Sequence, residues 1–160
     1  MQVIEQLKGM DAERFLHIYS ALESQGFGPL DGEVAKAMRF RPHAIRKLTM
    51  EKRAQKARSI LEGNSQAELA YELFGSYLLK TCKKLVTDFL DGTGVEHEDG
   101  MIENLQDGGP DPAKITETIN ALDGEHNPED VTLYLALCAE QWPQVTEVQA
   151  AWQSRVTATR

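Results

Sequence analysis

Long apolar runs are missing from this sequence, although 41% of its 160 residues are hydrophobic. A helix that crosses a membrane needs about 20 consecutive apolar residues, so we expect no membrane span and no membrane partner. The opening stretch MQVIEQLKGMDAERF also lacks the basic, apolar and small-residue regions of a secretory signal. Both absences predict a cytoplasmic protein.

Cysteine is scarce as well, with Cys82 and Cys138 the only two. Two cysteines are too few for a disulfide framework, and both lie within apolar helical patterns, which is typical of buried, reduced thiols. A phosphate-binding signature is also absent, because the glycine-rich stretch GFGPLDG follows no strand and lacks the Lys-Ser or Lys-Thr pair. We therefore expect no cofactor.

Strand-like alternation is nearly absent, and helical periodicity takes its place. The strongest pattern covers residues 66–91, and its broad apolar face predicts one long central helix. The apolar residues that recur every three or four positions there are Tyr71, Phe74, Leu78, Cys82, Leu85 and Phe89. We predict an all-α fold, a compact bundle of about seven helices around this long helix.

Four polar residues mark where other helices begin. Asp11 and Thr49 stand before apolar stripes with helical spacing, so each is a candidate N-cap that accepts a backbone N–H of the first turn. Asp111 and Asn127 each precede a proline, which suits the first helical position.

The two tryptophans, Trp142 and Trp152, end the last two helical patterns. Exposed aromatic residues often anchor a partner, but closing the core around the long helix explains these two equally well. We favour the core role.

Residues 91–110 carry many carboxylates and no helical pattern. An unstructured stretch of this length is uncommon in a compact domain. The pair Asp99-Gly100 suits a type I′ turn, which predicts a tiny β-hairpin over residues 95–105.

Three residues of this loop are weak candidates for metal ligands: Glu96, His97 and Asp99. Aligned on the calcium-binding EF-hand loop, the segment lacks the first ligand and the bidentate glutamate. A transition metal would want a second histidine or cysteine close in sequence, which is missing. His97 beside carboxylates suggests a general base, but no pocket or positioned substrate is visible. We therefore expect a solvated acidic loop, with no metal and no catalytic residue.

Charge is distributed very unevenly along the chain. Residues 34–60 contain nine basic residues and a single acidic one, Glu51, for a net charge of +8. Residues 88–147 contain fifteen carboxylates and a single basic residue, Lys114, for a net charge of −14. Such asymmetry indicates either a basic surface for an acidic partner or complementarity within the chain.

The length suits one domain over residues 1–160. We predict that a basic, helical N-terminal half, residues 1–63, packs on an acidic, helical C-terminal half, residues 64–160.

Residues 33–48 contain the small and apolar residues that two short helices need at a crossing and a turn. Ala35 would sit at the crossing, Phe40 would fill the turn, and Ile45 would anchor a second helix that Pro42 opens. This pattern resembles the helix-turn-helix of DNA-binding regulators.

The resemblance assigns roles to the basic residues nearby. The side chains that the family would aim into the major groove are His43, Arg46 and Lys47. The residues that would contact phosphates are Arg39, Arg41, Lys52 and Arg53. The same apolar set also suits two helices that pack together with a solvated basic rim, so both interpretations stay open.

These patterns favour a non-enzymatic helical interaction or adaptor protein, of unknown process, whose partner is another protein or a second copy of the chain. The alternative is a nucleic-acid-binding regulator that uses the basic segment 39–58. An enzyme ranks third, because no catalytic constellation is visible.

Overall fold

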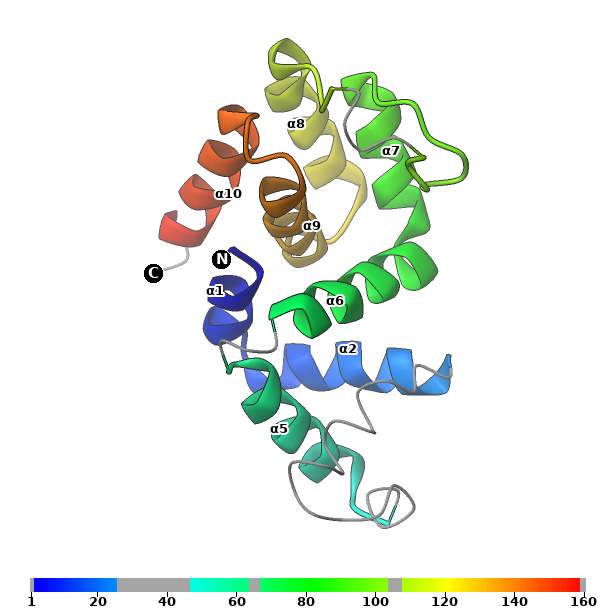
Figure 1. Ribbon diagram of the computed structural model, residues 1–160, viewed down its shortest axis with the longest axis vertical. Helices are drawn as coiled ribbons and strands as arrows, with labels where there is room; N and C mark the ends of the chain where they lie inside the picture. Colours follow the sequence, from blue (N-terminus) through cyan, green and yellow to red (C-terminus); the bar gives the residue numbers. More distant parts are fainter. Residues whose placement is uncertain (1, 26–46, 64–66, 104–107, 159–160) are drawn as a thin grey trace. The chain divides into compact units, whose positions relative to one another are not determined.

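Helices dominate the computed structural model, which describes residues 2–25, 47–63, 67–103 and 108–158 (Figure 1). Within these stretches the chain forms eight α-helices and one short 3₁₀ helix, and no strand occurs there, so the predicted all-α fold is confirmed. The bounds are α1 Gln2–Gly9, α2 Ala12–Ser24, α5 Met50–Leu61, α6 Ala67–Thr81, α7 Lys83–Thr93, η2 Pro112–Lys114, α8 Ile115–Glu125, α9 Pro128–Gln141 and α10 Thr146–Ala158.

The chain divides into two compact units, here called unit 1 (Val3–Tyr77) and unit 2 (Leu78–Arg160). The division falls inside α6. Unit 1 contains α1, α2, α5 and most of α6, and unit 2 contains the remaining helices.

Two amphipathic helices of unit 1, α2 and α5, begin at the predicted caps. Asp11 Oδ1 accepts the backbone N–H of Arg14 at 2.7 Å and starts α2. Thr49 Oγ1 accepts the backbone N–H of Lys52 at 3.3 Å and starts α5. The buried residues of α2 follow the predicted spacing: Phe15, Ile18, Tyr19 and Leu22.

The predicted single helix over residues 66–91 is wrong, because two helices occupy this stretch. α6 ends at Thr81 and α7 begins at Lys83, with Cys82 between them in a non-helical conformation (φ −119°, ψ 36°). Neither glycine nor proline marks the break, and a bend at one residue leaves the spacing of the apolar stripe intact. In unit 2, α7 then packs on α8.

The core of unit 2 surrounds α9, most of which is buried. Trp142 and Trp152 are only 1% and 3% exposed, so their predicted core role is confirmed. Helices α7 and α8 approach closely because Gly92 lacks a side chain; a Cβ there would lie 2.7 Å from Thr118 Cγ2. The buried residues of α9 are Val131, Leu133, Tyr134, Leu135, Ala136, Leu137, Cys138 and Ala139.

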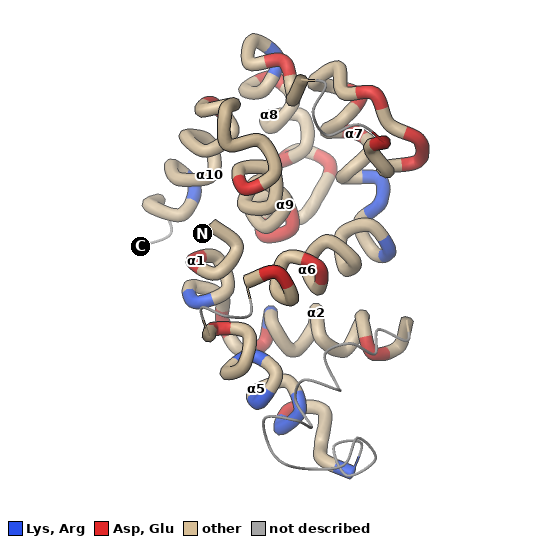
Figure 2. Tube along the Cα trace, viewed as in Figure 1, with Lys and Arg blue, Asp and Glu red and all other residues tan. Residues whose placement is uncertain are grey.

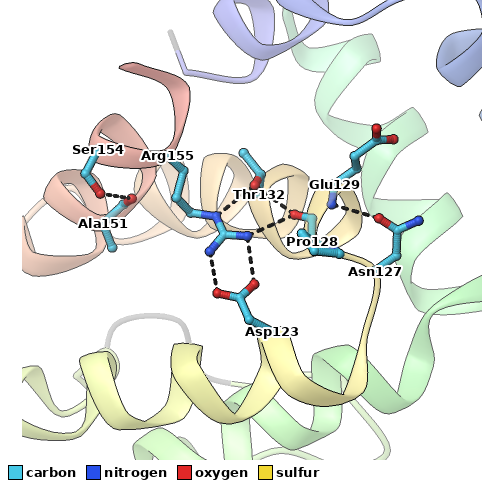
Figure 3. A network of polar contacts seen from close by, with 8 residues as sticks. All are labelled: Asp123, Asn127, Pro128, Glu129, Thr132, Ala151, Ser154 and Arg155. Carbon is cyan, nitrogen blue, oxygen red and sulfur yellow. Dashed lines mark hydrogen bonds and ion pairs between the residues drawn. The ribbon is translucent and has the colours of Figure 1, made fainter. Parts of the chain in front are cut away.

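Arg155 on α10 joins three helices of unit 2 through its guanidinium group (Figure 3). Two of its nitrogens donate to the two carboxylate oxygens of Asp123 on α8, at 2.7 and 2.8 Å. Nε donates to Thr132 Oγ1 at 2.8 Å, and Nη2 also donates to the carbonyl oxygen of Pro128 at 3.0 Å. The planar fork of arginine suits such bidentate pairing, and it ties α10 to α8 and to the start of α9.

The predicted turn at Asp99-Gly100 is confirmed. Both residues have positive φ, 57° and 88°, as a type I′ turn requires. Among the described residues of the loop, pairing is confined to one bridge, in which the Glu98 N–H donates to the Met101 carbonyl at 2.8 Å and the Met101 N–H donates to the Glu98 carbonyl at 2.9 Å. Over residues 95–103 the predicted hairpin is therefore limited to the turn and this bridge, and residues 104 and 105 of the prediction lie outside the described residues.

Candidate functional site

Lysine and arginine gather on α5 in unit 1, whereas acidic residues follow the loop after α7 in unit 2 (Figure 2). Charged surfaces attract partners of opposite sign, so each of these regions is a candidate binding surface. The contacts of the individual side chains decide how much of each surface is available.

Part of the predicted nucleic-acid surface lies outside the described residues, namely Arg39, Arg41, His43 and Arg46. Of the other predicted contacts, Lys47 and Lys52 are exposed. Arg53 instead forms an ion pair with Glu23 of α2, and the two side chains are 12% and 24% exposed. Arg53 therefore joins α5 to α2 within unit 1.

Arg58, another basic residue of α5, binds the end of α1. Nη2 donates to the carbonyl oxygens of Leu7, at 2.9 Å, and of Met10. Its guanidinium carbon lies 5.9 Å from the centre of the Phe15 ring, and Nε pairs with Glu62 at 3.0 Å. A helix C-terminus favours a positive charge, so Arg58 stabilises unit 1 from within.

The acidic loop of unit 2 surrounds a hollow of about 630 Å³, here called the acidic hollow. Three exposed glutamates line it, Glu96, Glu98 and Glu103, and no lysine or arginine of the described chain forms an ion pair with them. Met101 lies among them and is 60% exposed, alone among the large apolar side chains that the structure describes. The acidic hollow thus combines negative charge with an exposed thioether side chain.

His97 also lines the acidic hollow, but both of its ring nitrogens are engaged within the loop and α7. The backbone N–H of Gly100 donates to Nδ1 at 3.0 Å, and Nε2 lies 2.6 Å from Asp91 Oδ1. The side chain is only 12% exposed. A general base must reach a substrate proton, so this arrangement favours a structural role for His97.

The three weak metal candidates of the loop differ in their surroundings. Asp99 pairs with Lys83, and His97 binds Asp91, whereas Glu96 faces the hollow. Across the described stretches, none of the three belongs to a cluster of three or more closely spaced ligand-type side chains.

One polar cluster between α7 and α8 was not predicted from the sequence. Asp88, Glu125 and His126 bring ligand-type atoms within 4.8 Å of one another. Lys84 Nζ also lies there, 2.7 Å from Asp88 and 3.4 Å from Glu125. Its ammonium group already supplies positive charge to both carboxylates, so the cluster is an ion-pair network. The i,i+4 spacing of Lys84 and Asp88 is its one sequence signal.

Hydrogen bonds within this network shift the pKa values of Asp88 and Lys84. Partial burial raises the pKa of Asp88, but the hydrogen bonds with Lys84 and His126 outweigh it, and the net pKa lies below the ordinary value. The hydrogen bond with Asp88 raises the pKa of Lys84. Both groups therefore stay charged at neutral pH.

The cysteines offer little reactivity. Cys138 is buried in α9, and burial raises the pKa of its thiol well above the ordinary value, against a smaller opposing effect of the hydrogen bond with Tyr134. A thiol that resists ionisation is a poor nucleophile. Cys82 is half-buried at the break between α6 and α7.

Comparison of the chain with protein-family models, with curated proteins and with solved structures finds no match. No helix within the described residues combines the length and the apolar content that crossing a membrane requires. The two charged surfaces are therefore the features of the chain that bear on its function.

Proposed function

We propose that the chain is a non-enzymatic, cytoplasmic interaction protein whose acidic hollow binds a cationic segment of a partner protein. The observation that carries the proposal is the grouping of Glu96, Glu98 and Glu103 around the exposed Met101. No lysine or arginine of the described chain neutralises these glutamates, so their charge is available to a ligand.

Two physical effects support this choice of partner. Long-range attraction between opposite charges speeds encounter and discriminates against acidic partners. Met101 adds an apolar contact, and a flexible thioether adapts to differently shaped side chains. The favoured ligand is therefore an amphipathic basic segment in which lysine or arginine alternates with apolar residues.

The test is calorimetric titration with a synthetic amphipathic peptide of lysine and leucine. We expect binding to the native protein and a loss of about tenfold or more in affinity for the double variant Glu96→Gln, Glu98→Gln. The matched control is Glu117→Gln with Glu147→Gln, which removes the same charge from exposed positions on α8 and α10. Equal affinities for both double variants would reject the acidic hollow as the binding surface.

Met101→Ala separates the apolar contribution from the electrostatic one. We expect weaker binding of the lysine-leucine peptide and unchanged binding of oligolysine, which has no apolar side chain to place against Met101. A loss for both peptides would show that the variant disturbs the loop as a whole.

Nucleic-acid binding is a second candidate, favoured by the exposed lysines of unit 1: Lys47, Lys52 and Lys56. Lysines that contact phosphates release counterions, so affinity for duplex DNA would fall steeply with salt. Lys52→Glu combined with Lys56→Glu should then abolish binding and its salt dependence. Lys83→Glu with Lys114→Glu, the same change in unit 2, is the control. Absence of binding at low salt would end this alternative.

A second copy of the chain remains a candidate partner for either surface. The mass from sedimentation equilibrium distinguishes monomer from dimer. If a dimer forms through opposite charges, salt should dissociate it.

A further inference from the structure

The two hydrogen bonds of His97 fix the protonation state of its ring. A backbone N–H can only donate, so Nδ1, which accepts the Gly100 N–H at 3.0 Å, carries no proton. The ring proton of neutral histidine is then on Nε2, which donates to Asp91 Oδ1 at 2.6 Å. The hydrogen bond from Gly100 thus requires a neutral His97 ring whose proton is on Nε2.

A second proton on His97 would remove the acceptor of the Gly100 N–H. Two N–H groups would then face each other where a hydrogen bond stood, and a buried donor without an acceptor is unfavourable. Gly100 itself is buried, and a Cβ built there would lie 3.2 Å from Leu79 and 3.6 Å from Val86. The turn therefore has little room to adjust while it stays packed.

Charged groups from α7, from η2 and from the loop lie around His97. From α7, Asp91 contacts the ring, and Lys83 faces the loop through Asp99. From η2, Lys114 lies near Gly94 at the start of the loop. The acidic groups in the described part of the loop are Glu96, Glu98, Asp99 and Glu103. Carboxylates thus outnumber the two lysines around the ring, whereas only the neutral ring can accept the Gly100 N–H.

We propose that His97 is a proton-sensitive latch on the acidic hollow, and that protonation of its ring opens the turn at Asp99-Gly100 and weakens binding of a cationic partner. Asp91 holds the imidazolium against α7, so the turn moves rather than the ring. The released turn no longer positions Glu98 and Met101, and the new positive charge repels the ligand. The effect on binding rests on the function proposed above, whereas the opening of the turn does not.

Nuclear magnetic resonance of the native protein tests the latch without any ligand. At about pH 7.5 the ¹⁵N shifts of the His97 ring should report the neutral form with its proton on Nε2, and the Gly100 amide should be protected from exchange. As the pH is lowered toward about 5.5, where glutamates are still mostly ionised, the Gly100 amide should lose this protection in step with the double protonation of the ring that the ¹⁵N shifts report. A ring protonated on Nδ1 at the higher pH, or a Gly100 amide that does not respond, would overturn the proposal.

His97→Asn separates protonation of His97 from other effects of pH. The amide oxygen accepts the Gly100 N–H in place of Nδ1 and does not titrate, so Gly100 should stay protected at both pH values. The control His126→Asn removes the half-buried histidine of the α8 end, which binds Asp88, and should leave the Gly100 response as in the native protein. A Gly100 response that persists in His97→Asn would assign it to another group.

Calorimetry with the lysine-leucine peptide tests the coupling to binding. We expect affinity to fall about tenfold from pH 7.5 to pH 5.5 in the native protein and to stay within twofold for His97→Asn. Equal falls in the two proteins would reject the coupling. If the peptide binds at neither pH while the Gly100 amide still responds, the proposed function fails and the latch stands.

Discussion

A single arginine, Arg155, fixes the geometry of three helices in unit 2. Its guanidinium group donates to a carboxylate, a hydroxyl and a carbonyl oxygen at the same time. The ammonium group of lysine lacks the planar fork needed to bind all of them together. Sequence reasoning did not predict this network, because Asp123 and Thr132 are distant in sequence and carry no motif. Arg155 stands in the last turn of α10.

Arg155→Lys should destabilise the protein by about 1–3 kcal/mol, because lysine cannot form the bidentate pair and leaves half-buried acceptors unpaired. Urea unfolding monitored by circular dichroism measures the loss. Combined with Asp123→Asn, the two changes should cost less than the sum of their separate effects. Strict additivity would show that the pair does not interact in solution.

Asp88 gives the protein a defined response to acid. Its pKa is lower in the folded state than in the unfolded chain, so its carboxylate adds stability above the unfolded pKa of about 3.9. That stability is lost as pH falls through the lower folded pKa. Asp88→Asn should therefore be less stable than the native protein at neutral pH, with the difference shrinking below about pH 4. Glu117→Gln, an exposed carboxylate of α8, is the control in the same urea titrations.

Helix starts were predictable at the scale of elements because caps are local. Asp11, Thr49 and Asn127 are each followed within three residues by the backbone N–H that their side chains accept. The break at Cys82 was not predictable, because it involves neither a cap nor a helix breaker. α1 was also missed, since its three buried residues are too few to stand out as a stripe.

Removal of one N-cap side chain tests whether these caps stabilise the helices. Asn127→Ala should cost about 1 kcal/mol, because the Glu129 N–H loses its side-chain acceptor at the start of α9. Asn120→Ala, on the exposed face of α8, is the matched control and should change stability by no more than about 0.5 kcal/mol. Thermal unfolding followed by circular dichroism gives both values, and equal shifts would contradict the capping role.

Two glycines of unit 2 should respond in opposite ways to alanine. Gly100 has φ of +88°, and an added Cβ would lie 3.2 Å from Leu79, so Gly100→Ala should destabilise the loop by about 1–3 kcal/mol. Gly124 lies within α8 with no atom near an added Cβ, so Gly124→Ala should stabilise the protein by about 0.5–1 kcal/mol. Urea midpoints measure both changes, and a shift of the same sign in both would refute the argument.

Composition and periodicity predicted the helical class of the whole molecule, because amphipathic spacing is repeated in almost every segment. The acidic hollow was not foreseen as a site. Its glutamates were visible in the sequence, but the way that His97 and Gly100 fold the loop around Met101 depends on tertiary contacts. The roles of Arg53 and Arg58 in α5 also depend on tertiary contacts. Both arginines bind other helices of unit 1, but charge alone does not distinguish them in the sequence from the exposed lysines.

Salt should weaken binding to the acidic hollow, because screening at high ionic strength removes the long-range attraction. We expect the affinity of the lysine-leucine peptide to fall at least about fivefold between 50 mM and 500 mM sodium chloride. Calorimetry at several salt concentrations measures this dependence. Constant affinity over this range would indicate that apolar contacts dominate binding and that the glutamates do not contribute to it.

Both tryptophans of the chain, Trp142 and Trp152, are buried in unit 2. Intrinsic indole fluorescence is therefore a built-in reporter of that unit, while the far-ultraviolet signal averages the helices of both. Denaturation curves recorded with the two spectroscopies on one unlabelled sample will superimpose if the units melt together and separate if they melt in succession.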